Sequence, residues 1–423
     1  MTSFLRRPKT IFFSFCTVAG FLTALFITMD TWAINTYNYN PVIYAIVSEW
    51  VGLFSAFIIV LLLAKLKVTS AVGHKRPLGA LIDPEFVGLV WPGREYKQAF
   101  RYVAIGGVFG GVNTLFYFLA ADLVDPSIIQ PLFQVVTLYF LVIEVIFVEK
   151  EWPTIIEAMA VMNIVAGGIL LTISGNFSGD VVVGALFILG PVNITQVFIT
   201  FYQKKARQVK TPSGRRMDSL NIRLWLLAVM SVTTMIFGLP LFPKTIVKDT
   251  MANLYTMVPI SVVGMTVAFV AYVLYIRALA MGKMSIVNAV YSVSVVFSVI
   301  FTFVLGSVAP GTFGSFTNDQ FLWVIKVFGT ILVVAGIVVL SISEVQTYIF
   351  LTVRVGFVPG VMNQLSNLKV NKIALASGKF DIIVYLRSRS IGRVHSLLIK
   401  KIEQIPGIES MYTMAIMKRW ERY

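Results

Sequence analysis

The spacing of apolar segments constrains this chain more than any other feature of its sequence. A helix needs about 20 apolar residues to cross about 30 Å of hydrocarbon. Ten segments of about this length follow one another: 11–29, 41–64, 100–121, 126–148, 153–174, 181–202, 222–242, 257–279, 284–305 and 321–343. Only 13% of the 423 residues are charged, against roughly a quarter in a soluble protein. The sequence therefore predicts an all-α polytopic membrane protein with ten transmembrane helices.

Residue types that commonly build enzyme active sites are scarce in this chain. Cys16 is the only cysteine, and the two histidines, His74 and His395, are far apart. Neither a structural zinc site nor a cysteine–histidine nucleophile is expected from such a set. The glycine-rich motifs of hydrolases, nucleotide hydrolysis and dinucleotide binding are also missing. We expect no enzymatic activity, no metal site and no cofactor.

The Lys and Arg residues lie almost entirely on one side of the predicted spans. Placing successive loops on alternate sides puts twenty Lys and Arg residues on one side and two, Lys244 and Lys248, on the other. Basic loops stay in the cytoplasm, so we expect a multi-pass protein of the cell membrane with both termini cytoplasmic. Contact with anionic membrane lipid explains the positive charge of these loops better than nucleic-acid binding does.

Two parts of the chain repeat each other. Residues 165–174 read VAGGILLTIS and residues 334–343 read VAGIVVLSIS, with six of ten positions identical. The repeat divides the membrane part into residues 10–174 and 181–344, each with five predicted spans. Because five is odd, the second copy enters the membrane from the opposite face. Inverted repeats of this kind are typical of alternating-access transporters, whose substrate site lies where the halves meet.

The membrane part resembles a known family. Five plus five spans, basic cytoplasmic loops, the sequence FVEKEWPT (147–154) at the end of the fourth span and an Ala-Gly-rich fifth span carry the likeness. These features are similar to those of the drug/metabolite transporter superfamily, EamA-like branch. The resemblance implies export or exchange of small organic solutes, often amino acids. It also implies a central cavity lined by spans 1, 3, 4, 6, 8 and 9.

Residues 345–423 form a separate segment with a different composition. They contain twelve Lys and Arg but only four Asp and Glu, and no apolar stretch is long enough to span a membrane. Strands are predicted at 349–355, 372–376, 382–387 and 409–417, and helices after Pro359 and at 390–404. The order βαββαβ indicates a small α+β ferredoxin-like domain, which we expect in the cytoplasm.

This tail is similar to the ligand-sensing domain of the Lrp/AsnC regulators. The likeness rests on ASGKFDIIVYL (376–386), followed by a helix ending in IPGI (405–408) and a strand. It implies that Gly378, Phe380 and Asp381 bind an amino-acid effector at an interface between two subunits, and hence a homodimer through the tail. A hairpin turn in a tail that only dimerises or stabilises the protein is the alternative. Without a helix-turn-helix, no nucleic-acid partner is expected.

Polar side chains recur on single faces of several predicted spans. Polar groups are costly in hydrocarbon and usually face other helices or a wet cavity. The predicted substrate-binding residues are Asn113, Tyr117, Gln130, Gln134, Thr137, Asn193, Gln196, Tyr272, Tyr275, Asn288, Tyr291 and Ser292. For each of them, hydrogen bonding between helices without substrate contact is the alternative.

Four charged residues are candidates for proton coupling or gating. Glu49 lies in the outer half of the second span, where it either reaches outward to water or carries a proton. Glu144 and Glu157 fall at similar depth near the cytoplasmic ends of consecutive antiparallel spans, with Arg277 near the same face. These three either form an ion-pair gate or simply reach water.

These observations favour a transporter that moves a small organic metabolite, such as an amino acid, by alternating access. An amino acid bound to the tail is expected to regulate it. The alternative is a membrane receptor whose helical bundle no longer transports and which signals through the tail. A polar cavity within the bundle favours the transporter, whereas a packed apolar bundle favours the receptor.

Overall fold

The computed structural model divides the chain into two compact units. A helical unit extends to Val338, and a C-terminal unit begins at Val339. The structure describes residues 8–69, 75–93, 95–143, 159–160, 162–164, 166–167, 170, 179–241, 246–281, 284–309, 319–342, 345–368, 370, 372–388 and 400–416.

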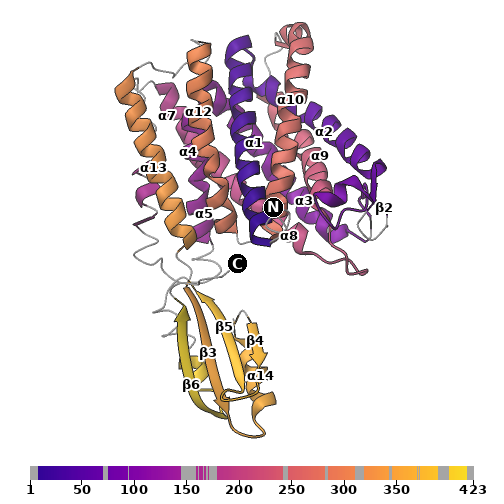
Figure 1. The fold of residues 1–423 in the computed structure, drawn as a ribbon. Coiled ribbons are helices and arrows are strands. Elements are labelled where there is room, and N and C mark those ends of the chain that lie inside the picture. Colours follow the sequence, from indigo (N-terminus) through magenta and orange to yellow (C-terminus); the bar gives the residue numbers. More distant parts are fainter. Residues whose placement is uncertain are drawn as a thin grey trace. The chain divides into compact units, whose positions relative to one another are not determined.

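Helices make up nearly all of the helical unit, in which α1 lies between α10 and α12 (Figure 1). The described α-helices are α1 (Pro8–Tyr37), α2 (Pro41–Lys65), α3 (Lys97–Leu123), α4 (Pro126–Gln134), α5 (Val136–Ile143), α7 (Gly179–Phe187), α8 (Asn193–Gln208), α9 (Ser219–Gly238), α10 (Ile246–Met281), α11 (Met284–Tyr291), α12 (Val293–Val308) and α13 (Gln320–Ile342). Six segments are long and apolar enough to cross a membrane: Ile11–Tyr37, Pro41–Lys65, Lys97–Leu123, Gly179–Gln208, Ser219–Leu241 and Asn253–Met281.

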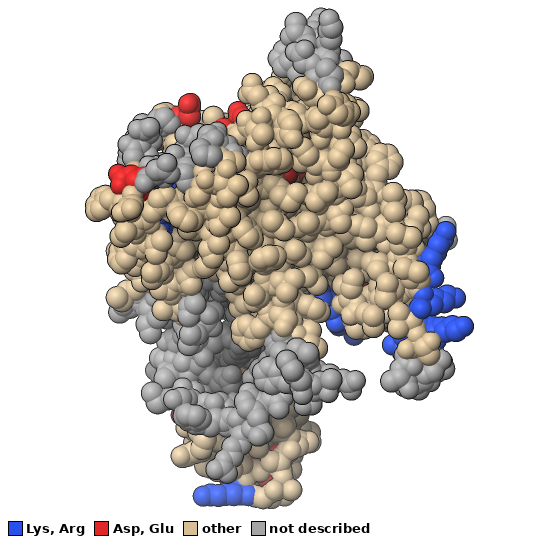
Figure 2. Space-filling model, turned by 45° about the horizontal axis from the view of Figure 1, so that its top comes forward, with Lys and Arg blue, Asp and Glu red and all other residues tan. Residues whose placement is uncertain are grey.

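The outer surface of these helices is apolar. On α2, Phe54, Ile58 and Leu62 recur every four residues, so they share one face, and all three are exposed. On α13, Phe321 and Phe328 are exposed in the same way. Figure 2 shows the flank of the helical unit almost free of charge, with Lys and Arg at one end and Asp and Glu at the other. Such a surface fits a lipid environment.

Two predicted spans are each broken into two helices. The segment 126–148 contains α4 and α5 with a break at Val135, and 284–305 contains α11 and α12 with a break at Ser292. After each break an N–H bonds the carbonyl oxygen three residues back, instead of four: Leu138 to Val135 at 2.9 Å and Val295 to Ser292 at 2.9 Å. The two breaks fall in the fourth and ninth predicted spans, each of which is the fourth span of its repeat.

The remaining predicted spans differ from the structure mainly at their ends. Helix α1 continues past Met29, the predicted end, to Tyr37, and α9 begins at Ser219, before the predicted start at Ile222. The sixth predicted span contains α7 and α8, joined by a π-helical turn (Ile188–Val192) that includes Pro191. Proline cannot donate a backbone hydrogen bond, which explains the irregular turn. Of the fifth predicted span only eight residues are described, and all are helical.

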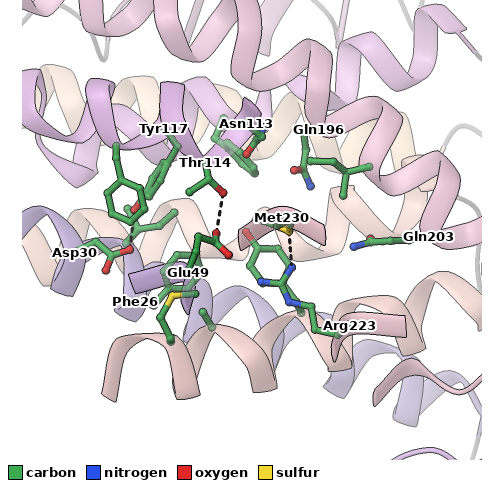
Figure 3. Close-up of a pocket in the computed structure, with 17 residues that line it drawn as sticks. Phe26, Asp30, Glu49, Asn113, Thr114, Tyr117, Gln196, Gln203, Arg223 and Met230 are labelled. Carbon is green, nitrogen blue, oxygen red and sulfur yellow. Dashed lines mark hydrogen bonds between the residues drawn. The ribbon is translucent and has the colours of Figure 1, made fainter. Parts of the chain in front are cut away.

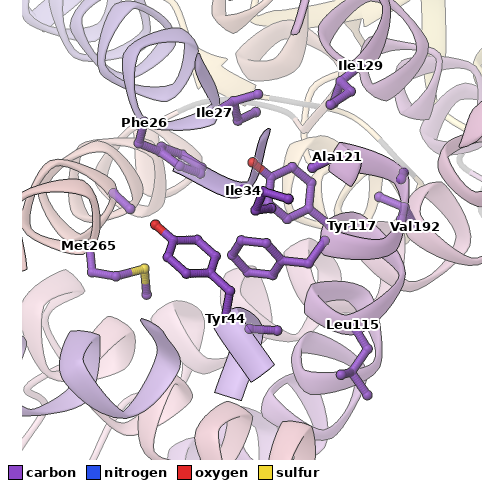
Figure 4. Close-up of a cluster of buried hydrophobic side chains, with 14 of the residues drawn as sticks. Phe26, Ile27, Ile34, Tyr44, Leu115, Tyr117, Ala121, Ile129, Val192 and Met265 are labelled. Carbon is purple, nitrogen blue, oxygen red and sulfur yellow. The ribbon is translucent and has the colours of Figure 1, made fainter. Parts of the chain in front are cut away.

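Small residues let α3 and α9 pack closely. A Cβ atom built on Gly107 would lie 2.5 Å from Val229 Cβ, and one on Gly111 would lie 2.5 Å from Thr233 Cβ. Both contacts have the same separation in sequence, so the two helices run parallel. The apolar core of the unit continues beside this contact and includes Tyr44 and Tyr117 (Figure 4).

The segments around Gly167 and Gly336 meet in a self-complementary contact. A Cβ on Gly167 would lie 2.6 Å from Gly329 O, and a Cβ on Gly336 would lie 2.6 Å from Ala160 O. Positions 160 and 167 precede 329 and 336 by the same 169 residues that separate the repeated sequences. Because 167 meets 329 and 160 meets 336, the two segments run antiparallel.

The C-terminal unit is a four-stranded antiparallel sheet with helices. Its elements are β3 (Val345–Val353), α14 (Val358–Asn367), β4 (Lys372–Leu375), β5 (Ile382–Ser388), α16 (Lys400–Glu403) and β6 (Ile408–Ile416). The strand order is β4-β5-β3-β6, as a βαββαβ ferredoxin-like chain requires. Alternate residues such as Ile349 and Leu351 of β3 are buried with Val361 and Leu365 of α14.

Candidate functional site

A cavity inside the helical unit contains three buried charged side chains. Helices α1, α2, α3, α8, α9 and α10 supply most of its walls (Figure 3). Its lining residues are Phe26, Ile27, Asp30, Glu49, Asn113, Thr114, Tyr117, Phe118, Phe133, Gln196, Ile199, Gln203, Arg223, Met230, Met265, Ala268 and Tyr272. Charged groups inside a bundle with an apolar outer surface are costly and mark functional positions.

Asp30 lies within α1 because the helix continues beyond this residue. Its side chain is buried, and both carboxylate oxygens accept hydrogen bonds from tyrosines. Tyr44 donates to Oδ1 at 3.3 Å, and Tyr117 donates to Oδ2 at 3.4 Å. The two phenols therefore hold the carboxylate in place between α2 and α3.

Glu49 is also buried, and it faces the cavity. It accepts a hydrogen bond from Thr114 Oγ1 at 2.9 Å. Among the residues that the structure describes, its second oxygen, Oε2, has no hydrogen-bond partner. The expectation that Glu49 reaches outward to water is wrong, because α2 turns this side chain toward α3. Its free oxygen remains available to a proton or to a cationic group.

Arg223 supplies the positive charge of the cavity and is only 4% exposed. Its guanidinium carbon lies 4.2 Å from the centre of the Tyr272 ring, and Nη1 donates to Met230 Sδ at 3.7 Å. Within the described part of the chain, Nε has no hydrogen-bond partner and no carboxylate forms an ion pair with Arg223. A sulfur atom and a ring face stabilise a guanidinium only partly.

The charges follow an order along the cavity. Helices α3 and α9 run parallel, so residues early in either helix lie toward the same end of the bundle. Arg223 is in the first turns of α9, whereas Tyr117, which bonds Asp30, is near the end of α3. The cavity is therefore positive toward the end where α3 and α9 begin, and negative farther along it.

At that same end, Asp83 forms ion pairs with two arginines. Asp83 Oδ1 lies 2.9 Å from Arg207 Nη2 and 3.4 Å from Arg277 Nη1. Its Oδ2 accepts hydrogen bonds from the backbone and hydroxyl of Ser219, both at 2.8 Å. These contacts join the α2–α3 loop to α8, α9 and α10.

Asp218 lies beside this cluster and caps α9. Its Oδ1 accepts the Asn221 backbone N–H at 2.9 Å, and its Oδ2 accepts from the Asn221 amide at 2.7 Å. Burial raises the pKa of Asp218 to about 6, although the hydrogen bonds from Asn221 oppose the rise.

A second ion pair lies beyond the other end of α3. Lys326 of α13, which is fully buried, lies 3.4 Å from Asp125 Oδ2 and donates to Ser127 Oγ at 2.9 Å. Asp125 also caps α4 by accepting the Ser127 backbone N–H at 2.8 Å. Each end of α3 is therefore close to a buried pair of opposite charges.

The structure brings part of the predicted substrate-binding set together. Asn113, Tyr117, Gln196 and Tyr272 line the cavity with Glu49. Asn113 also donates to the Val192 carbonyl oxygen at 2.7 Å, beside the π-helical turn.

The other predicted substrate-binding residues lie outside the lining of this cavity. Those residues are Gln130, Gln134, Thr137, Asn193, Tyr275, Asn288, Tyr291 and Ser292. Ser294 Oγ donates to Gln130 at 3.1 Å and accepts from Gln134 at 3.2 Å, which links α4 to α12.

Further hydrogen bonds hold four of these residues. They run from Asn193 to the Leu132 carbonyl oxygen at 2.9 Å, from Tyr275 to Asn288 at 2.8 Å and from Tyr291 to Thr23 at 2.6 Å. Thr137 is buried, and Ser292 is the residue at the break between α11 and α12.

Of the predicted gate, only Arg277 is among the described residues. Its carboxylate neighbour is Asp83, which the sequence did not single out. Glu144 and Glu157 lie outside the described residues.

Sequence reasoning missed Asp30 and Arg223, two of the three charged residues in the cavity. Each lies within two residues of a predicted span end, where a charge reads as the start of a loop. Arg223, the second residue of a predicted span, is one of the twenty basic residues that the alternation of loops assigns to the cytoplasmic side. For Asp30, the apolar residues that follow it, Ala33 and Ile34, were a usable signal that the helix continues.

The predicted effector residues lie at the turn between β4 and β5. Gly378 has a φ of 143°, a conformation that favours glycine. The ring of Phe380 lies 5.1 Å from that of Phe350, and Asp381 Oδ2 accepts the Val353 backbone N–H at 2.8 Å. The carboxylate therefore ties this turn to the end of β3.

Comparisons with known proteins give no family for this chain. No family model and no curated protein matches it. A solved structure titled "Crystal structure of protein" is 17% identical, with 77% of this chain and 98% of that chain covered and a TM-score of 0.46.

Proposed function

We propose that this protein is a membrane transporter that exports or exchanges a small polar organic metabolite, such as an amino acid, by alternating access. The observation that carries the proposal is the buried cavity with Asp30, Glu49 and Arg223 on its walls. A bundle that served only as a scaffold would gain nothing from burying three charges that form no ion pair with any described residue. The polar cavity also favours a transporter over the receptor.

Internal symmetry supports ten spans arranged as two inverted repeats. The segments around Gly167 and Gly336 are equivalent in the repeat, and they contact each other in antiparallel orientation. Copies inserted in the same direction would place equivalent helices parallel, whereas inverted copies place them antiparallel. The matched breaks at Val135 and Ser292 lie where discontinuous helices often form transporter sites. Ten spans require each broken pair to cross once, with α13 and the segment 153–174 completing the set.

The ion pairs near the two ends of α3 suit an alternating-access cycle. Opening the cavity to one side requires contacts at that end to separate while the opposite end stays closed. Asp83 with Arg207 and Arg277 lies at one end, and Lys326 with Asp125 lies at the other. Basic residues gather at the first of these ends, which we assign to the cytoplasm together with both termini.

The carboxylates and the tail supply coupling and regulation in this proposal. Glu49, with its free oxygen, is the candidate for coupling to a proton gradient. The C-terminal unit responds to an amino-acid effector at the β4–β5 turn or pairs two subunits. Membership of the EamA-like transporters and the Lrp/AsnC-type origin of the tail belong to the same proposal, since they rest on sequence resemblance.

Reconstitution into liposomes tests the transport proposal. Purified protein is assayed for uptake and counterflow of a panel of labelled metabolites, with and without a pH gradient. We expect saturable flux of at least one small polar solute. The double variant that carries Glu49→Gln and Asp30→Asn should show no flux. Arg216→Gln is the matched control, because Arg216 is exposed in the α8–α9 loop. Ligand binding without flux would instead identify a receptor.

A further inference from the structure

We infer that the cavity binds a zwitterion, an α-amino acid with an apolar side chain, whose carboxylate pairs with Arg223 and whose ammonium group pairs with Glu49. The inference rests on the proposed transport function and names the substrate class of the same cavity. It is carried by two side chains that are buried, lack a partner of opposite charge within 4 Å among the described residues, and line one cavity.

Arg223 has the chemistry of a carboxylate-binding group. A guanidinium has five N–H donors in a planar fork, and a carboxylate accepts two of them in parallel. The described groups in direct contact with Arg223 are the Met230 sulfur and the Tyr272 ring, neither of which neutralises its charge. The guanidinium lies over the Tyr272 ring, which holds it in the cavity wall where a carboxylate can meet it.

Glu49 is the better partner for the ammonium group, because it keeps a free acceptor. Both oxygens of Asp30 accept hydrogen bonds from Tyr44 and Tyr117. Glu49 accepts one bond from Thr114, and its Oε2 has no partner in the described part of the chain. An ammonium group has three donors and no acceptor, so a free carboxylate oxygen suits it.

The arrangement of charges selects a zwitterion over a simple ion. Glu49 lies between Arg223 and Asp30 in the view of Figure 3. A free anion at Arg223 would be repelled by the two carboxylates, and a free cation at Glu49 would be repelled by Arg223. A neutral ligand with separated charges satisfies both groups at once.

The remaining walls define the side chain of the ligand. Phe26, Phe118, Phe133, Met230 and Met265 line the cavity. No further charged side chain faces it among the described lining residues. Aromatic rings and methionines bind apolar groups, and methionine adapts to their shape. Leucine, an α-amino acid with an apolar side chain, is therefore chosen as the probe.

Ligand-dependent thermal stability of the full-length protein in detergent tests this inference. The probes are leucine, its decarboxylated analogue 3-methylbutylamine and its deaminated analogue 4-methylpentanoate. We expect leucine to raise the melting temperature at concentrations where neither analogue does, because a ligand that binds only the folded state stabilises it. Arg223→Lys and Glu49→Gln should each weaken apparent leucine affinity by about thirtyfold or more. Arg216→Gln should leave the affinity unchanged.

Three results would overturn the inference. One is that 4-methylpentanoate binds as tightly as leucine, which would remove the role of Glu49. Another is that Arg223→Lys and Glu49→Gln, both folded, bind leucine like the unmodified protein. The third is that leucine and other apolar amino acids do not bind while liposomes carry a different solute. In that last case the transport proposal stands and only the substrate class fails, whereas absence of any flux in the metabolite panel contradicts the transport proposal itself.

Discussion

Two parts of the helical unit bury charge in opposite ways. Near the ends of α3, Asp83 contacts Arg207 and Arg277, and Asp125 contacts Lys326, so both of these aspartates have an opposite charge within 4 Å. In the cavity, Arg223 forms no ion pair with a described residue. The pairs link segments that are distant in sequence, whereas the cavity residues face a common space.

The difference indicates different uses of a costly group. Burying a charge removes it from water, and a nearby opposite charge offsets much of that cost. Near the ends of α3, the fold itself supplies the opposite charge, so these charges should matter most for stability. In the proposed transporter, a ligand or a proton supplies the compensating charge in the cavity, so those charges should matter most for activity.

The largest expected effect contrasts two aspartates, one from each region. Asp83→Asn removes the negative charge between Arg207 and Arg277. Because breaking a buried pair leaves an uncompensated charge, we expect a loss of about 3–5 kcal/mol of stability. Asp30→Asn should cost less than about 1 kcal/mol, because the amide oxygen still accepts from one tyrosine and the amide NH2 can donate to the hydroxyl oxygen of the other. Thermal unfolding of the two detergent-purified variants compares their losses of stability. Equal losses would contradict the proposed difference between the two regions.

An intermediate effect should appear in the pH dependence of stability near the paired end. The pKa of Asp218 is raised from its ordinary 3.8 to about 6. The folded protein therefore binds the proton of Asp218 more tightly than the unfolded chain does. The resulting stabilisation of the folded state is fully present below about pH 4 and is lost as pH rises through 6. The full loss corresponds to roughly 3 kcal/mol at most.

Asp218→Asn isolates that contribution. Asparagine also caps helices, so the variant keeps the cap of α9 but has no proton to lose at this position. We expect the variant to gain stability relative to the unmodified protein as pH rises from 4 to 7, measured by melting in detergent. Parallel stability curves over that range would contradict the assignment.

The smallest expected effect concerns the glutamines at the contact between the broken helices. Gln130→Ala and Gln134→Ala each remove a hydrogen bond with Ser294 that links α4 to α12, worth about 1 kcal/mol. If this contact moves during transport, the double variant should insert normally into the membrane but transport more slowly. Unchanged kinetics in liposomes would show that the α4–α12 contact does not influence the cycle.

The sequence was most informative where one physical effect dominates. Apolar length predicted the long helices, and alternating apolar residues predicted the four strands of the C-terminal unit. Hydropathy failed at Asp30 and Arg223, because a hydropathy scan ends a span at a charged residue. The scan contains no information on Tyr117 and Tyr272, which contact these charges in the folded protein. Residue spacing identified Asn113, Tyr117, Gln196 and Tyr272 of the cavity.

Spacing did not separate these residues from Gln130 and Gln134, which meet Ser294 instead. Periodicity gives the face of a helix on which a residue lies, but the neighbour it meets depends on tertiary packing. The breaks at Val135 and Ser292 were missed for a similar reason, since neither position carries a proline or glycine.

Access to the cavity from each side of the membrane tests the central claim most directly. Ala268→Cys places one thiol in the cavity lining on a background in which the buried Cys16 is replaced by alanine. In sealed vesicles, a membrane-impermeant thiol reagent should label this position from outside and, in separate vesicles, from inside. Saturating leucine should slow both reactions. Labelling from one side only, under every condition, would contradict alternating access and point to a receptor.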